Sequence, residues 1–163
     1  MAKKVAYSAM LIALGIIFSY VELLIPFSFG IPGIKLGLAN LVVVVGILLL
    51  PKKQIFIILV ARIVLVSFLF GNMSSMIYSL AGGLLSFVIM CLFQKCKGFS
   101  MIGISMAGGV SHNVGQLIVA ACVVESTSVF YYMPILMIVG ALTGSVIGLV
   151  GERVSMYVTK NKG

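Results

Sequence analysis

The sequence predicts an all-α membrane protein that crosses the bilayer with six helices and forms a single domain over residues 1–163. Of its residues, 62% are hydrophobic and only 9% are charged, whereas soluble domains carry about 25% charged residues. The apolar residues gather in long runs, separated by short segments that contain lysine, glycine or proline. A soluble fold could not bury so much apolar surface, so the runs are predicted to be membrane helices.

The helices follow from these runs in order. The first is predicted over residues 5–24, and a loop over residues 25–35 with several glycines and prolines follows it. The second, residues 36–50, is short for a span of about 20 residues, so we expect the preceding loop to pack down into the protein. The remaining helices are predicted at 55–70, 75–93, 102–124 and 130–157, with breaks at 51–54, 71–72, 94–98 and 125–128.

The positive charges predict which ends of the helices face the cytoplasm. If the N-terminus is cytoplasmic, the segments on that side carry Lys3, Lys4, Lys52, Lys53, Lys95, Lys97, Arg153, Lys160 and Lys162. The opposite side carries only Lys35. Because lysine and arginine accumulate in cytoplasmic loops, we expect a multi-pass protein of the cell membrane with both termini in the cytoplasm. The net charge of +8 comes from these clusters between helices, which are not a nucleic-acid face.

Catalytic and cofactor motifs are missing from the sequence. It contains no aspartate, and its acids are Glu22, Glu125 and Glu152. One histidine and three scattered cysteines do not make a metal site, and the sequence has no GxxxxGK[ST] segment that could bind ATP. We therefore expect no enzyme activity, no bound cofactor and no metal. If the protein drives transport, the energy must come from a partner or a gradient.

Small residues recur at a spacing of four, which is typical of close helix contacts in lipid. They are Gly103, Ala107, Ser111 and Gly115 on the fifth helix, Gly140, Gly144 and Gly148 on the sixth, and Ala9 and Ala13 on the first. For the fifth and sixth helices we expect packing inside the bundle. For the two alanines of the first helix, internal packing and contact with another subunit are both open.

Arg62 lies about halfway along the third predicted helix. An arginine at the bilayer centre costs roughly 2.5–3.5 kcal/mol on insertion scales, so it should face protein or a water-filled cavity. Glu22 is the only acid that could reach it inside the bundle. Arg62 therefore either makes a structural tie with Glu22 or with backbone carbonyls, or it binds an anionic or carbonyl-rich ligand.

Polar residues also gather on the fifth helix and in the outer half of the bundle. His112 and Gln116 share one helix face because they are four residues apart, and Asn113 points to an adjacent face. His112 alone could be a hydrogen-bonded core group, but the cluster favours a ligand pocket. The predicted pocket opens outward beneath the segment 30–40 and includes Glu22, Lys35, Asn40, Arg62, Asn72, His112, Asn113 and Gln116.

Four segments resemble a known family: residues 33–40 (GIKLGLAN), 69–75 (LFGNMSS), 78–83 (YSLAGG) and 111–116 (SHNVGQ). In this order they resemble the Gx transporter family, which is also labelled heptaprenyl diphosphate synthase component I. That family is similar to the substrate-binding S components of energy-coupling factor (ECF) transporters. The resemblance spans nearly the whole chain.

The resemblance implies an S-component-like bundle of six helices, with both termini inside and an outward-facing pocket covered by the loop between the first two helices. It implies that Ala9 and Ala13 contact a membrane coupling protein, which works with two ATPase subunits that alone use ATP. It also implies a small-molecule ligand such as a vitamin, a flavin, or a quinone or isoprenoid precursor, in Gram-positive bacteria.

Two other functions compete with solute binding. A catalyst of heptaprenyl diphosphate synthesis would need aspartate-rich motifs to hold magnesium diphosphate, and the sequence contains no aspartate; an accessory role stays open. A membrane scaffold for a quinone-synthesis or flavin-linked electron-transfer system would make its contacts through helix faces or turns, and it predicts no solute pocket.

Overall fold

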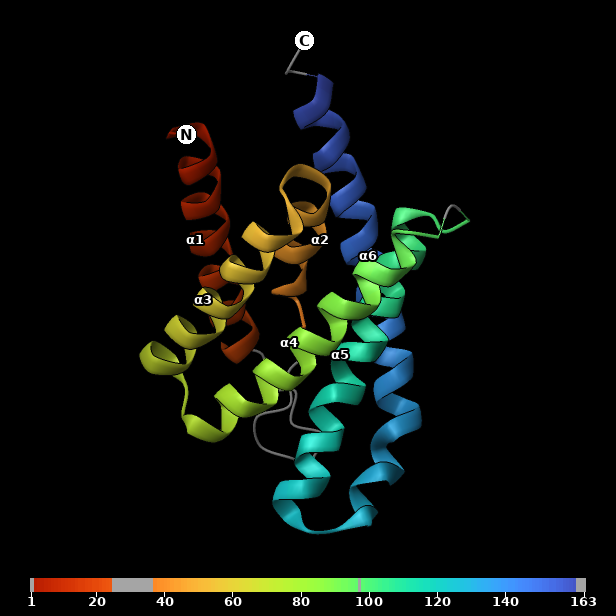
Figure 1. Ribbon diagram of the computed structural model, residues 1–163. Helices are drawn as coiled ribbons and strands as arrows, with labels where there is room; N and C mark the ends of the chain where they lie inside the picture. The colour runs from red at the N-terminus through yellow and green to blue at the C-terminus, as the bar shows by residue number, and fades with distance from the viewer. Residues whose placement is uncertain (1, 25–36, 97, 161–163) are drawn as a thin grey trace.

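The computed structural model of the protein describes residues 2–24, 37–96 and 98–160. These residues form six α-helices and one short 3-10 helix (Figure 1). In chain order they are α1 (Ala2–Leu24), α2 (Asn40–Leu49), α3 (Lys52–Phe70), α4 (Met73–Phe93), α5 (Met101–Val124), η1 (Thr127–Tyr132) and α6 (Met133–Lys160). The predicted all-α class and the six helices are confirmed.

Five of the helices, α1, α3, α4, α5 and α6, are long and apolar enough to cross a membrane, so the chain is a multi-pass membrane protein. The hydrocarbon core of a bilayer is about 30 Å thick. The ten residues of α2 reach only about 15 Å at 1.5 Å per residue. The second predicted span is therefore a helix of half the membrane thickness.

The predicted start of the second helix, at residue 36, is wrong. α2 begins at Asn40, after a turn over Leu38 and Ala39. The backbone at Gly37 has a φ of 84°, which an α-helix does not allow, and its N–H donates to Oε1 of Glu22 on α1. The helix starts late because a partner distant in the sequence holds the backbone ahead of it. The loop predicted to cover the pocket, residues 25–35 with Lys35, lies outside the described residues.

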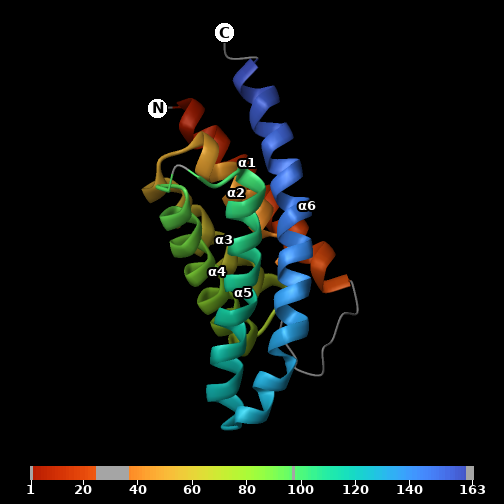
Figure 2. The ribbon, with the colours of Figure 1, turned by 90° about the vertical axis from the view of Figure 1, so that its right-hand side faces the viewer.

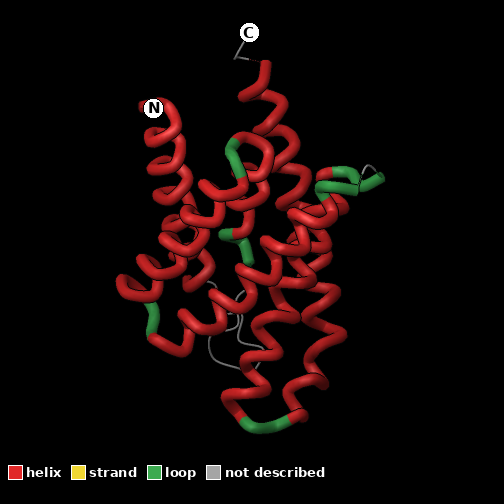
Figure 3. The backbone as a smooth tube through the Cα atoms, in the orientation of Figure 1, coloured by secondary structure: helices red, strands yellow, loops and turns green. Residues whose placement is uncertain are grey.

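Successive helices run in opposite directions through the bundle (Figure 1, Figure 2). Both ends of the chain and the turns after α2 and α4 lie at one end of the bundle, and the turns after α3 and α5 lie at the other (Figure 3). We call these the terminal end and the far end. Of the lysines predicted to share one side, Lys52, Lys53 and Lys95 lie at the terminal end, and Lys97 lies outside the described residues. That the terminal end faces the cytoplasm remains a prediction.

A smaller buried apolar cluster, with Tyr78, Leu117 and Leu136, lies toward the far end. The larger apolar core fills the half of the bundle that lies toward the terminal end. It includes Val43 of α2, Leu59 of α3, Met90 of α4, Ile104 of α5 and Ile147 of α6, all of them buried. Polar residues are concentrated beyond this core, where α2 begins. The core therefore separates them from the terminal end of the molecule.

α5 and α6 pack with their backbones in contact through small residues. A Cβ added to Gly144 would lie 2.6 Å from the carbonyl oxygen of Ser105, and one added to Gly140 would lie 2.7 Å from that of Gly109. The prediction of internal packing is confirmed for these glycines of α6. On α5, Gly115 lies against the backbone of α4, so its predicted packing inside the bundle is confirmed as well, and the α5 glycine that meets α6 is Gly109.

α1 packs on α2 and α3 at the edge of the bundle. Its inward face consists of the buried residues Leu11, Gly15, Ser19 and Glu22. Ala9 and Ala13 lie on the outer face and are exposed. Of the two alternatives for these alanines, their exposure favours a contact outside the chain, with lipid or with another subunit.

Candidate functional site

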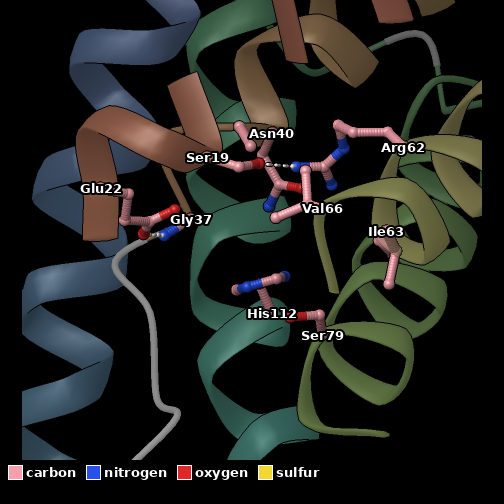
Figure 4. A pocket seen from close by; sticks show the side chains of 10 residues that line it. Ser19, Glu22, Gly37, Asn40, Arg62, Ile63, Val66, Ser79 and His112 are labelled. Carbon is pink, nitrogen blue, oxygen red and sulfur yellow. Dashed lines mark hydrogen bonds between the residues drawn. The ribbon is translucent and has the colours of Figure 1, made fainter. Parts of the chain in front are cut away.

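A small cavity lies between the start of α2 and the helices α1, α3, α4 and α5 (Figure 4). Its volume is about 20 Å³, and a buried water needs at least about 10–15 Å³, so the cavity has room for about one water molecule. The polar residues that line it are Ser19, Glu22, Asn40, Arg62, Ser79 and His112, joined by Gly37, Ala39, Ile63 and Val66. Of these, the sequence predicts Glu22, Asn40, Arg62 and His112.

Arg62 is the charged centre of the cavity, with 5% of its surface exposed. Its aliphatic stem packs on Gly15 of α1, where a side chain would clash with it. Its Nη1 donates to Oγ of Ser19, also on α1, over 3.2 Å. The Glu22 carboxylate lies within electrostatic range of the guanidinium. α1 therefore supplies the space, a hydroxyl acceptor and a negative charge that allow an arginine to sit inside a membrane bundle.

Glu22 and Gly37 tie the end of α1 to the start of α2. The carboxylate accepts the N–H of Gly37, so it fixes the backbone where the chain returns to the middle of the bundle. Gly37 also lies against His112, because a Cβ at this glycine would stand 3.2 Å from Cδ2 of the imidazole. A residue other than glycine would meet both a strained φ and the histidine ring.

His112 reaches the cavity from α5 and is held between two glycines. On the side opposite Gly37 lies Gly82 of α4, where a Cβ would stand 3.0 Å from Cε1 of the imidazole. In Figure 4, His112 and Ser79 lie on one side of the cavity, while Arg62, Ser19 and Asn40 lie on the other. The cavity is thus bounded by polar groups on both sides.

Three polar atoms of buried residues around the cavity have unused hydrogen-bonding capacity within the described part of the chain. They are Nε of Arg62, Oδ1 of Asn40 and Oγ of Ser79. The other end of the Asn40 carboxamide is engaged, because its Nδ2 donates to Oγ of Ser86 over 3.2 Å. A buried polar atom without a partner costs about 1–3 kcal/mol. A ligand or water in the cavity would satisfy a donor at Arg62, an acceptor at Asn40 and a hydroxyl at Ser79.

The other predicted site residues lie apart from this cavity. Nδ2 of Asn113 donates to the backbone carbonyl of Leu136 on α6 over 2.7 Å, so Asn113 joins α5 to α6. Gln116 is fully buried against Gly82 of α4. Asn72 is exposed and caps α4 by accepting the N–H of Ser75 over 2.8 Å. Lys35 lies outside the described residues. A ligand-binding role for any predicted site residue remains a prediction.

Ser19 and Ser79 were not predicted as site residues. Ser19 precedes Glu22 by three residues and therefore shares a helix face with it, which is a signal that the sequence does contain. Ser79 lies among small residues of α4 in the segment YSLAGG, and nothing in its local sequence distinguishes it from a packing residue.

A second and larger hollow opens at the far end of α3 and α4, next to the cavity. Its volume is about 250 Å³. The described residues that line this α3–α4 groove are Ser67, Phe68, Gly71, Asn72, Met73 and Met76. Asn72, which was predicted as part of the pocket, lies in this groove instead. Apart from Ser67 and Asn72, the groove is apolar.

Residues 11–154 match the profile of one protein family, described as heptaprenyl diphosphate synthase component I. The chain belongs to the heptaprenyl diphosphate synthase component I family. The match contains all four segments on which the resemblance rests, as well as the cavity and the groove. Comparison with curated proteins and with solved structures found no match.

The match confirms the predicted resemblance to the heptaprenyl diphosphate synthase component I family. The similarity to ECF S components is a separate statement, which the match does not include. Among the described residues, no three histidine, cysteine or acidic side chains gather where they could hold a metal ion.

Proposed function

We propose that the protein is the substrate-binding membrane subunit of an ECF-type transporter and that it captures a small solute from outside the cell. The observation that carries the proposal is the cavity around Arg62. Polar side chains from α1, α2, α3, α4 and α5 meet there in the middle of an apolar bundle, and an ionisable residue inside a membrane points to a functional site as the first hypothesis. A scaffold needs no polar cavity of this kind for contacts through its outer helix faces.

Two further features support the proposal. The cavity lies beyond the apolar core, on the side away from the lysine clusters, so with cytoplasmic termini it opens toward the outside. The outer face of α1 exposes Ala9 and Ala13, where close approach by a membrane coupling protein would be possible. Two ATPase subunits attached to that coupling protein would supply the energy, and the chain itself would bind neither ATP nor a metal and would catalyse no reaction.

The test is co-purification with a candidate coupling protein and its ATPases from the same cell. Ala9→Trp or Ala13→Trp should reduce the recovered complex, because a bulky ring at a small-residue contact keeps two helices apart. The matched control is Leu14→Trp, because Leu14 is also exposed on α1 but points about 120° away from the midpoint between the two alanines at 100° per residue. Undiminished assembly of both alanine variants would contradict the proposal.

The family description supports one alternative, an accessory role in heptaprenyl diphosphate synthesis. Without aspartate the chain would assist a catalytic subunit and would not bind magnesium diphosphate itself. This alternative predicts that the purified protein raises the rate of a prenyl-transferring partner in reconstituted membranes. It also predicts that Arg62→Met, which alters the cavity, leaves that rate unchanged.

A further inference from the structure

We propose that the cavity and the α3–α4 groove form one continuous binding site for an amphipathic molecule, which has a polar head that both accepts and donates hydrogen bonds and an apolar body. The head would lie at Arg62, Asn40 and Ser79, and the body would lie in the groove. This inference rests on the proposed solute-binding function and names its ligand class.

The two hollows are stacked along the same pair of helices. On α3, Ile63 lines the cavity and Ser67, one turn later, lines the groove. On α4, Ser79 lines the cavity and Met76, one turn earlier, lines the groove. α3 and α4 run in opposite directions and are joined only by Gly71 and Asn72, so these turns face each other. A step of about 5.4 Å, one helical pitch, separates the cavity from the groove.

The polarity of the site changes along this path. At the inner end, Arg62 is 5% and Asn40 is 4% exposed, and each carries a polar atom without a partner in the described chain. One step outward, Oγ of Ser67 is also buried and has no partner there. At the mouth, Phe68 is 78% and Met73 is 65% exposed. The hydrogen-bonding groups are thus deep, and the apolar surface is at the rim.

This gradient decides the class of ligand. A wholly polar solute would leave the Phe68 and Met73 rim in contact with water or lipid for no gain. A wholly apolar molecule would leave the inner donor at Arg62 and acceptor at Asn40 unsatisfied, at a cost of about 1–3 kcal/mol each. A head that ends in a hydroxyl satisfies both, because a hydroxyl accepts from Arg62, donates to Asn40 and is about the size of the one water molecule that the cavity can hold. Together the groove and cavity approach the lower limit of about 300 Å³ for small-molecule sites.

The experiment uses single cysteines in the full chain in lipid nanodiscs, with Cys91, Cys96 and Cys122 replaced by serine. Ser79→Cys places a thiol at the inner end. The probe is N-phenylmaleimide, whose carbonyls can accept from Arg62 and whose ring is apolar, so it represents the acceptor and the apolar body of the proposed ligand. Met76→Trp fills the groove and should slow labelling of Ser79→Cys about tenfold or more, which corresponds to about 1.4 kcal/mol in barrier height.

The control thiol is Ile77→Cys, because Ile77 lies on the same helix but is exposed on its outer side. Its labelling should not change when Met76→Trp is added, and an unchanged size-exclusion profile and helical circular-dichroism spectrum show that this variant is folded. If Met76→Trp fails to fold, Met73→Trp at the exposed mouth replaces it, with the same expectation. A second comparison uses a cationic reagent, a maleimide with a trimethylammonium head. For each reagent, the labelling rate of Ser79→Cys is divided by its labelling rate in a variant that retains only the exposed Cys96. This ratio should be higher for N-phenylmaleimide than for the cationic reagent.

Equal labelling of Ser79→Cys with the groove open and filled would overturn the proposal, because the cavity would then be reached by another route. A normalised preference for the cationic reagent would overturn the amphipathic assignment. Neither result depends on the ECF partners, so this test and the co-purification test fail independently.

Discussion

Gly37→Ala should destabilise the protein more than any ordinary glycine-to-alanine change, and the structure gives the magnitude. The φ of 84° at Gly37 costs a residue with a Cβ roughly 1–2 kcal/mol. The added Cβ would also stand 3.2 Å from Cδ2 of His112, so the buried imidazole would have to shift by a few tenths of an ångström. Such overpacking typically costs about 1–3 kcal/mol. Together these effects predict a loss of about 2–5 kcal/mol in the free energy of unfolding.

For a chain of this length, 1 kcal/mol shifts the unfolding temperature by about 2–4 °C, so we expect the melting temperature of Gly37→Ala to be about 4–20 °C lower than that of the wild type. The chain has no tryptophan, so the assay is circular dichroism at the helical band in detergent. The control is Gly98→Ala, because a Cβ at Gly98 meets no atom within 4 Å. If both variants unfold at the wild-type temperature, the description of the α2 start given above is wrong.

Three further changes test other parts of the structure. Asn72→Ala should lower the free energy of unfolding by about 0.5–2 kcal/mol because it removes the side-chain cap of α4. Asn72→Asp should cost little, because aspartate can still accept the N–H of Ser75. Equal unfolding temperatures for the two variants would contradict the capping role. Gly144→Leu should abolish the monodisperse peak in size-exclusion chromatography, because even a Cβ there would stand 2.6 Å from the backbone of α5; a normal elution profile would refute the backbone contact. The hydrogen bond between Asn40 and Ser86 can be measured with Asn40→Ala, Ser86→Ala and the double variant in thermal melts. The stability loss of the double variant should differ from the sum of the two single losses by about 0.5–1.5 kcal/mol. If the single losses add exactly, the bond contributes nothing to stability.

Most of the fold could be predicted from the sequence because apolar runs and lysine-bearing turns are local signals. The helices α3 to α6 lie close to the predicted ranges, and Asn72 caps α4 at the predicted break. The start of α2 could not be predicted in the same way. Residues 36–39 look like the beginning of an apolar helix, and only the bond from Gly37 to Glu22, fifteen residues earlier, keeps Gly37 out of it.

The candidate site could be predicted in part. Arg62, Glu22 and His112 stand out because charged or titratable groups are rare in membrane helices, and all three line the cavity. Asn113 was grouped with His112 because the two are adjacent, yet adjacent helical residues are about 100° apart, and Asn113 meets α6 instead. Ser79 was missed because a serine in an apolar helix is ordinary; only its position opposite Arg62 across the cavity gives it significance.

The half-length of α2 has an electrical consequence. Because α2 reaches only about 15 Å from the terminal end, the groups where it begins lie near the midpoint of the hydrocarbon layer. A charge that moved from outside to Arg62 would cross about half of the membrane potential, which is about 1.2 kcal/mol per 100 mV given 2.3 kcal/mol for the full distance. An uncharged ligand would do no such work. Affinities measured in detergent, where no potential exists, would therefore apply to an energised cell for an uncharged ligand but not for a charged one.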